Sequence, residues 1–132
     1  DYGIPVTAAK LAKENNIKTF LVISAMGANE KSNVFYNKTK GEMEHGVLKQ
    51  HIKNTFILRP SLIGGDRKEQ RIGEKIALVV FKLMQPLLIG NLKQYKTIDA
   101  ENIAKAMLYL ANKKINAEVI ITSNEILKLS KK

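Results

Sequence analysis

The sequence predicts an α/β fold built on a parallel sheet. Amphipathic helical patterns alternate with short apolar runs along the 132 residues, which is the arrangement expected of this fold class. Two of the runs, residues 20–23 and 119–121, are apolar throughout instead of alternating with polar residues. Strands that are buried between two layers of helices have this pattern, so the sheet is expected to be parallel.

The first half of the chain is expected to form two helices and two strands. In order, the expected elements are a helix at 4–15, a strand at 18–24, a helix at 34–51 and a strand at 55–59. Asn15 and Asn16 end the first helical pattern, and an apolar stretch follows them. Pro60, Gly64 and Gly65 come after the second strand and predict a turn.

The second half continues the same alternation. In order, the expected elements are a helix at 68–82, an apolar segment at 86–89, an extended segment at 94–98, a helix at 100–112, a strand at 118–122 and a final helix. Asp99 is expected to cap the helix at 100–112 because its carboxylate can accept hydrogen bonds from the first helical N–H groups. The length and ordinary globular composition fit one domain, or part of one.

A hydroxyl and a Tyr-Lys pair follow the first expected strand. Ser24 ends the apolar run, and Tyr36 and Lys40 lie four residues apart on the next helix. Residues at this spacing share one helix face, so the Lys40 ammonium is expected to favour the Tyr36 phenolate and prepare it for proton transfer. The spacing alone is a weak signal, since Tyr109 and Lys113 repeat it without a preceding strand, and we interpret that second pair as chance.

These residues resemble the active site of the short-chain dehydrogenase/reductase superfamily, which has a Ser at a strand end and a Tyr-x-x-x-Lys on the following helix. Residues 24–28, 36–42 and 58–60 resemble its atypical, NAD(P)-binding branch, and most closely the Tat-interacting-protein-like oxidoreductases. The resemblance implies the C-terminal part of a doubly wound, mostly parallel Rossmann-like sheet. Residues 1–132 would then be the C-terminal portion of a single NAD(P)-binding domain, because the Gly-rich phosphate turn of such enzymes does not occur in the sequence.

The same resemblance implies an NAD(P)-dependent oxidoreductase in a full-length parent, with the 132-residue piece inactive alone. Tyr36 would be the general acid/base, Lys40 would lower its pKa, and Ser24 would hydrogen-bond a carbonyl or hydroxyl substrate. The implied cofactor is NAD or NADP, with its phosphate-binding half outside this sequence. The residues implied to contact it are Tyr36, Lys40, Pro60, Ser61, Leu62 and Ile63.

Two alternative functions remain open at this point. One is a non-catalytic NAD(P)-binding regulatory or scaffold protein, which would use the fold for dinucleotide binding without turnover. The other is an enzyme resembling the nucleotide-sugar epimerases and dehydratases, which share the Tyr-Lys pair. That enzyme would need a larger C-terminal substrate domain than the 73 residues after Arg59 readily supply.

Composition narrows the possible partners. The absence of cysteine excludes disulfides and thiolate ligands, and the spacing of His45 and His51 does not indicate a metal site. The net charge is +10, but 19 of the 22 basic residues are Lys and are spread along the chain, so we do not expect nucleic-acid binding. No apolar run reaches the ~18 residues that span a bilayer. We expect a cytoplasmic protein, without a membrane partner, that could form a homodimer.

Overall fold

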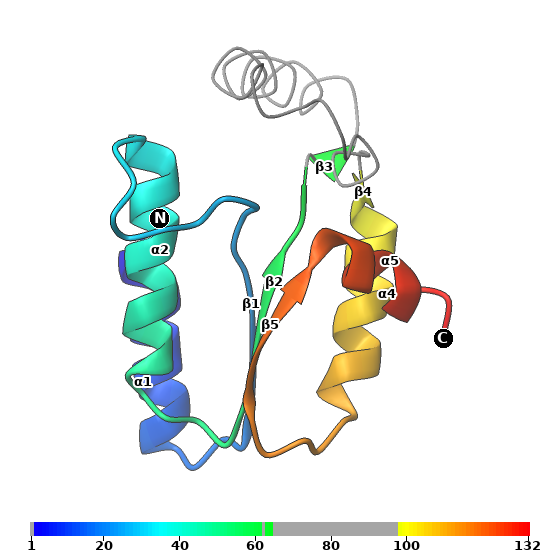
Figure 1. Cartoon of the computed structure of the whole chain (residues 1–132). Helices are drawn as coiled ribbons and strands as arrows, with labels where there is room; N and C mark the ends of the chain where they lie inside the picture. The colour runs from blue at the N-terminus through cyan, green and yellow to red at the C-terminus, as the bar shows by residue number, and fades with distance from the viewer. Residues whose placement is uncertain (1, 62, 65–97) are drawn as a thin grey trace.

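The computed structural model describes residues 2–61, 63–64 and 98–132 (Figure 1). In chain order, its elements are α1 (Gly3–Glu14), β1 (Thr19–Ile23), α2 (Phe35–Leu48), β2 (Asn54–Arg59), β3 (Ile63–Gly64), β4 (Ile98–Asp99), α4 (Ala100–Ala111), β5 (Glu118–Thr122) and α5 (Ser123–Leu129). The helices and strands predicted within these ranges are confirmed, with small shifts at their ends. The predicted helix at 68–82, the segment at 86–89 and most of the segment at 94–98 lie outside the described residues.

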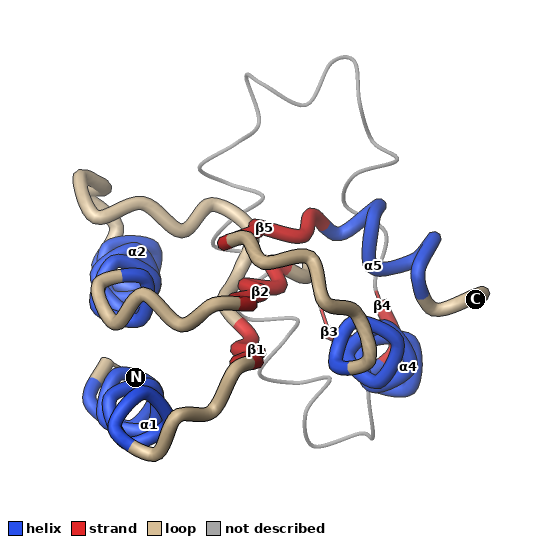
Figure 2. The backbone as a smooth tube through the Cα atoms, turned by 90° about the horizontal axis from the view of Figure 1, so that it is seen from below, coloured by secondary structure: helices blue, strands red, loops and turns tan. Residues whose placement is uncertain are grey.

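Within the described residues, the main sheet has three parallel strands in the order β1-β2-β5. Helices α1 and α2 cover one face, and α4 and α5 cover the other (Figures 1 and 2). The predicted α/β class and parallel sheet are therefore confirmed, and the arrangement is that of a Rossmann-like fold. Because the three strands are parallel, their carboxyl ends meet at one edge of the sheet.

The central strand β2 contributes to two hydrophobic cores. Phe56 and Leu58 pack into the cluster that includes residues of α4 and α5, and Ile57 packs into the cluster that includes residues of α1 and α2. All three side chains are fully buried. Burial on both faces explains why these three consecutive residues are all apolar.

Some of the residues predicted to end helices or form turns have the predicted role, and others do not. Asn16 has a left-handed backbone with φ of 57°, a conformation that Asn tolerates better than most residues, and it follows α1 as predicted. Asp99 precedes α4 as predicted, but its side chain makes no capping hydrogen bond. The turn predicted at Gly64 was wrong, because Gly64 belongs to β3 and pairs in parallel with Asp99 of β4. Gly65, which was predicted to continue that turn, lies outside the described residues.

Candidate functional site

A cavity of about 230 Å³ lies at the carboxyl ends of the three parallel strands. Its lining residues are Met26, Gly27, Arg59, Thr122, Ser123 and Asn124. They come from the loop after β1, the last residue of β2, and the junction of β5 with α5. In open α/β sheets, ligands bind in the crevice outside the carboxyl ends of the strands, so this cavity is the candidate site.

Ser24 follows β1 at this edge of the sheet, and its hydroxyl has no hydrogen-bond partner among the described residues. Its backbone N–H donates to the Leu58 carbonyl oxygen at 2.7 Å, which continues the pairing of β1 with β2. The residue is only 3% exposed, and its Oγ has no hydrogen-bond partner in the part of the chain that the structure describes. A buried hydroxyl without a partner costs about 1 to 3 kcal/mol, so Ser24 is positioned to gain from a polar ligand.

The loop that follows Ser24 is held against the end of β2 and against α2. The Met26 N–H donates to the Pro60 carbonyl oxygen at 3.0 Å, and the Asn29 N–H donates to the Asn37 carbonyl oxygen at 2.9 Å. Gly27 has a φ of 83°, a left-handed conformation that favours glycine. The structure therefore brings together two of the segments that the sequence analysis singled out, 24–28 and 58–60.

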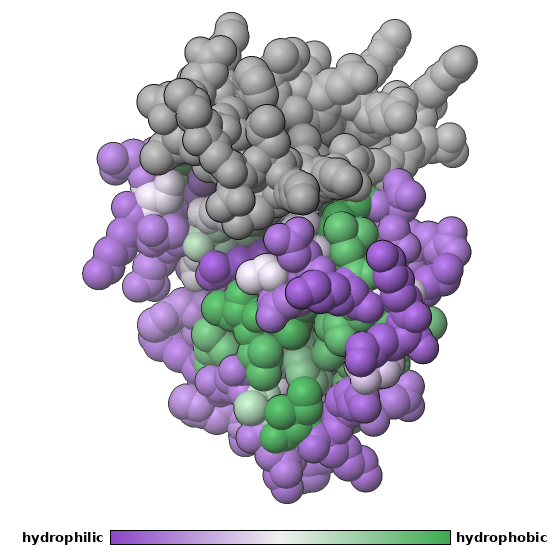
Figure 3. Space-filling model, turned by 45° about the vertical axis from the view of Figure 1, so that its right-hand side comes forward, coloured by the Kyte–Doolittle hydropathy of each residue, from purple (hydrophilic) through white to green (hydrophobic). Residues whose placement is uncertain are grey.

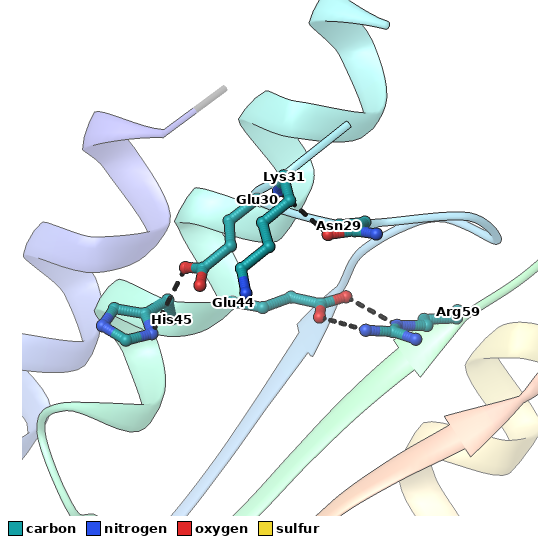
Figure 4. Close-up of polar contacts among 6 residues, drawn as sticks. All are labelled: Asn29, Glu30, Lys31, Glu44, His45 and Arg59. Atoms are coloured by element: carbon teal, nitrogen blue, oxygen red, sulfur yellow. Dashed lines mark hydrogen bonds and ion pairs between the residues drawn. The ribbon is translucent and has the colours of Figure 1, made fainter. Parts of the chain in front are cut away.

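One wall of the cavity is held by an ion pair that the sequence analysis did not identify. The Arg59 guanidinium donates to both carboxylate oxygens of Glu44, at 2.9 Å from Nε and 2.6 Å from Nη2 (Figure 4). The Glu44 side chain is 6% exposed and that of Arg59 is 29% exposed. The hydrogen bond with Glu44 raises the pKa of Arg59 above its ordinary value. This pair fixes α2 to the end of β2 and neutralises the charge of Arg59.

Two serines connect the end of β2 to the start of α5. The Ser61 N–H donates to Ser123 Oγ at 3.2 Å, and the Ser123 hydroxyl donates to Ser61 Oγ at 3.0 Å. The first turn of α5 is also closed by a capping box between Thr122 and Glu125. The Thr-x-x-Glu spacing of that box was visible in the sequence and could have marked this junction.

Of the other residues expected to contact a cofactor after β2, Pro60 is fully buried and Ile63 is exposed on β3. Leu62 lies outside the described residues. The described lining of the cavity includes none of Pro60, Ser61 and Ile63. Their predicted contacts with a cofactor remain predictions.

Tyr36 and Lys40 lie side by side on α2. The Lys40 Nζ atom is 5.8 Å from the centre of the Tyr36 ring, as the four-residue spacing predicted. The expected effect on acidity was wrong, however, because burial raises the pKa of Tyr36 above 10.0. The described residues that line the cavity include neither side chain.

Tyr109 and Lys113, the pair that was interpreted as chance, show the opposite shift in the pKa of the tyrosine. Lys113 Nζ lies 4.7 Å from the centre of the Tyr109 ring on α4. The hydrogen bond to Lys113 lowers the pKa of Tyr109 below 10.0. Identical sequence spacing thus gives opposite shifts in pKa, because a hydrogen bond with Lys113 is the largest influence on Tyr109, whereas burial is the largest influence on Tyr36.

Titration of the tyrosines is expected to separate these two pairs. Absorbance difference titrations of Tyr36→Phe and Tyr109→Phe against the unsubstituted chain should place ionisation of Tyr36 above pH 10.0 and that of Tyr109 below it. Since the folded state holds the Tyr36 proton more tightly than the unfolded state, its contribution to stability is present below about pH 10 and is lost as the pH rises through the folded pKa. A Tyr36 midpoint below that of Tyr109 would contradict the structure.

The two histidines each lie near a glutamate. His45 Nδ1 is 3.5 Å from Glu30 (Figure 4), and His51 Nδ1 is 3.5 Å from Glu118. Within residues 2–61, 63–64 and 98–132, the structure shows no group of three or more His, Cys, Asp or Glu side chains that could hold a metal ion. The helices in these same ranges include none that is long and apolar enough to cross a membrane.

The fold and the cavity define an α/β protein with a Rossmann-like parallel sheet and a ligand crevice at its carboxyl edge. The chain is similar to proteins named FMP52, mitochondrial. It is 38% identical to the protein of Candida albicans over 98% of this chain and 58% of that protein, and 34% identical to the Emericella nidulans protein over 96% and 54%. The Debaryomyces hansenii protein is 35% identical over 85% and 49%. The chain therefore spans about half the length of these curated relatives, and no family model matches it.

These comparisons overturn several expectations. The assignment to the Tat-interacting-protein-like short-chain dehydrogenases, and with it the NAD(P)-dependent oxidoreductase function, was wrong, because the relatives are named FMP52. The expected cytoplasmic location was also wrong, since the same names place these proteins in mitochondria. The physical reason is that a Ser and a Tyr-x-x-x-Lys pair arise readily in a Lys-rich α/β chain, and the absence of cysteine does not identify a compartment.

Proposed function

We propose that this chain is part of a mitochondrial protein that binds a dinucleotide, NAD or NADP, at the carboxyl edge of its parallel sheet. The mitochondrial location rests on the shared name of the relatives. The binding rests on one observation above all, the buried Ser24 hydroxyl that has no partner among the described residues. Ser24 is not itself among the described lining residues, but it precedes Met26, which is, by two positions. The proposal is one of binding and includes no chemical turnover.

The cavity is suited to one end of such a ligand. Its volume of about 230 Å³ is below the ~300 to 1,000 Å³ of sites that enclose a whole small molecule. The described lining residues present hydroxyl and amide groups, and Glu44 neutralises Arg59, the one cation among them. These groups suit the nicotinamide–ribose end, which carries no anionic group and supplies a carboxamide and hydroxyls for hydrogen bonding. Ser24 and Asn124 would hold it, and Tyr36 and Lys40 remain proposed contacts with the ribose.

The test combines binding of four dinucleotides with a pair of serine variants. Amide chemical shifts of the chain are followed during titration with NAD+, NADH, NADP+ and NADPH. We expect saturable changes centred on Gly27 and Asn124, with a dissociation constant of about 1 mM because only one end of the ligand is held. Absence of change with all four compounds, or change confined to other surfaces, would refute the proposal.

Ser24→Ala and Ser123→Ala form a matched pair, since both residues are buried and only Ser123 has a described partner. Ser24→Ala is expected to leave the free energy of unfolding unchanged or to raise it by up to ~1 kcal/mol, while it weakens dinucleotide binding about fivefold. Ser123→Ala should lower the stability by ~1 kcal/mol. Urea unfolding measures both, and equal destabilisation by the two substitutions would show that Ser24 has a structural partner.

A further inference from the structure

Strand β5 forms one edge of the main sheet among the described strands. The Thr55 N–H donates to the Ala117 carbonyl oxygen at 3.1 Å, so the backbone groups of Ala117 face β2. Since these groups alternate along a strand, the N–H and C=O groups of Glu118 and Ile120 point away from β2. Among the described residues these groups have no backbone partner, so they can pair with another strand.

This edge lacks several of the features that usually prevent strand pairing, although Glu118 places one charge on it. The sequence of β5 contains no Pro, Lys or Arg, and its register with β2 runs from 118 to 122 without a bulge. Ile120 is 41% exposed on the α1/α2 side of the sheet, and Ile115 before the strand is also exposed. Figure 3 shows the hydrophobic surface on the side of the molecule that includes β5.

The charge distribution favours a second copy of the chain at this edge. None of the 22 basic residues lies between positions 115 and 127, so the stretch that includes β5 carries no lysine or arginine that would repel the same stretch of a second copy. The other edge, β1, differs because α1 lies beyond it along the sheet (Figure 2). Two copies that met at β1 would bring their α1 helices into collision.

Symmetry and the free backbone groups select one register for a pair of antiparallel β5 strands. A two-fold axis at Glu118 would place two carboxylates opposite each other. An axis at Ile120 would require the Thr122 N–H, which already donates to Glu125 Oε2 at 2.7 Å. An axis at Val119 uses only the free groups of Glu118 and Ile120 and places each Glu118 opposite Ile120 of the other copy.

We propose that the chain forms a two-fold symmetric homodimer through antiparallel pairing of β5 with β5, centred on Val119. The sheet then continues across the axis in the order β1-β2-β5-β5-β2-β1. The interface contains four backbone hydrogen bonds, which join Glu118 of each copy to Ile120 of the other. It also covers the exposed Ile120 side chains of both copies. This inference is independent of dinucleotide binding.

A charge substitution at Ile120 tests the register. Ile120→Glu places like charges opposite Glu118 twice per dimer, whereas Ile120→Lys places opposite charges there. Sedimentation velocity at near-physiological salt, where the Debye length is about 8 Å, should show a dimer dissociation constant at least about tenfold higher for Ile120→Glu than for Ile120→Lys. A monomer at every concentration, or equal weakening by both substitutions, would overturn the proposal.

Because the chain has no cysteine, a single introduced thiol gives a second readout. Val119→Cys places two thiols at the axis, where the Cα atoms of a non-hydrogen-bonded pair are about 4.5 Å apart, within the range that a disulfide spans. Mild oxidation should yield a covalent dimer. Leu108→Cys, on the exposed outer side of α4, serves as the control, and cross-linking it as efficiently as Val119→Cys would also overturn the proposal.

Discussion

Replacement of Gly41 by alanine is expected to lower the free energy of unfolding by about 3 kcal/mol. A Cβ atom at this position of α2 would overlap the backbone nitrogen of Glu30 and the carbonyl carbon of Asn29. Both are backbone atoms, so no side-chain rotation relieves the overlap. The loop between β1 and α2 would have to move away from the helix, and that loop carries Met26 and Gly27 of the candidate site.

Gly3→Ala is the control for this prediction. A Cβ at Gly3 would have no heavy atom within 4 Å among its described neighbours, and alanine is the better helix former. Urea unfolding followed by circular dichroism should therefore show unchanged or slightly higher stability for Gly3→Ala and a large loss for Gly41→Ala. An unchanged midpoint for Gly41→Ala would mean that the loop does not pack on α2.

Arg59→Met is expected to cost about 3 kcal/mol of stability. The substitution keeps much of the side-chain volume but leaves the Glu44 carboxylate, 6% exposed, without its partner. We place the cost at the lower end of the range for broken buried pairs because Arg59 itself is 29% exposed. Chemical unfolding of the single variant and of the Glu44→Met/Arg59→Met double variant measures the effect, and the double variant should recover most of the loss.

An exposed ion pair provides the comparison. Lys105 Nζ lies 2.8 Å from Glu101 on the surface of α4, so Lys105→Met should leave the stability nearly unchanged. A cost for Arg59→Met as small as that for Lys105→Met would show that the Glu44–Arg59 pair is not formed in solution.

Local patterns in the sequence were sufficient for the order of the elements and the parallel sheet. The continuous apolar runs at 20–23 and 119–121 and the helical periodicity between them depend only on burial and on neighbours along the chain. Glu44 could not be found in this way, because its partner Arg59 lies 15 residues away on another element and nothing in the spacing connects them. The turn expected at Gly64 failed for a related reason, since its strand exists only through pairing with β4.

In the candidate site too, features that depend on residues close in sequence could be predicted, whereas features that depend on distant parts of the chain could not. The Tyr36–Lys40 spacing correctly predicted that the two side chains are neighbours, yet the direction of the Tyr36 pKa shift depends on burial by the surrounding structure. Ser24 was identified from its place at a strand end. Thr122, Ser123 and Asn124 join the same cavity only because β5 pairs with β2, more than 60 positions away in sequence.

The position of β2 between two cores has a consequence for how the molecule loses its structure. Ile57 belongs to one hydrophobic cluster, and its sequence neighbours Phe56 and Leu58 belong to the other. If either helical layer detaches, β2 loses the side-chain packing on that face that keeps the strand in place. The cluster on the opposite face then loses its contacts with β2 as well. The two layers are therefore one cooperative unit, and partial unfolding of one layer alone is not a low-energy state of this part of the chain.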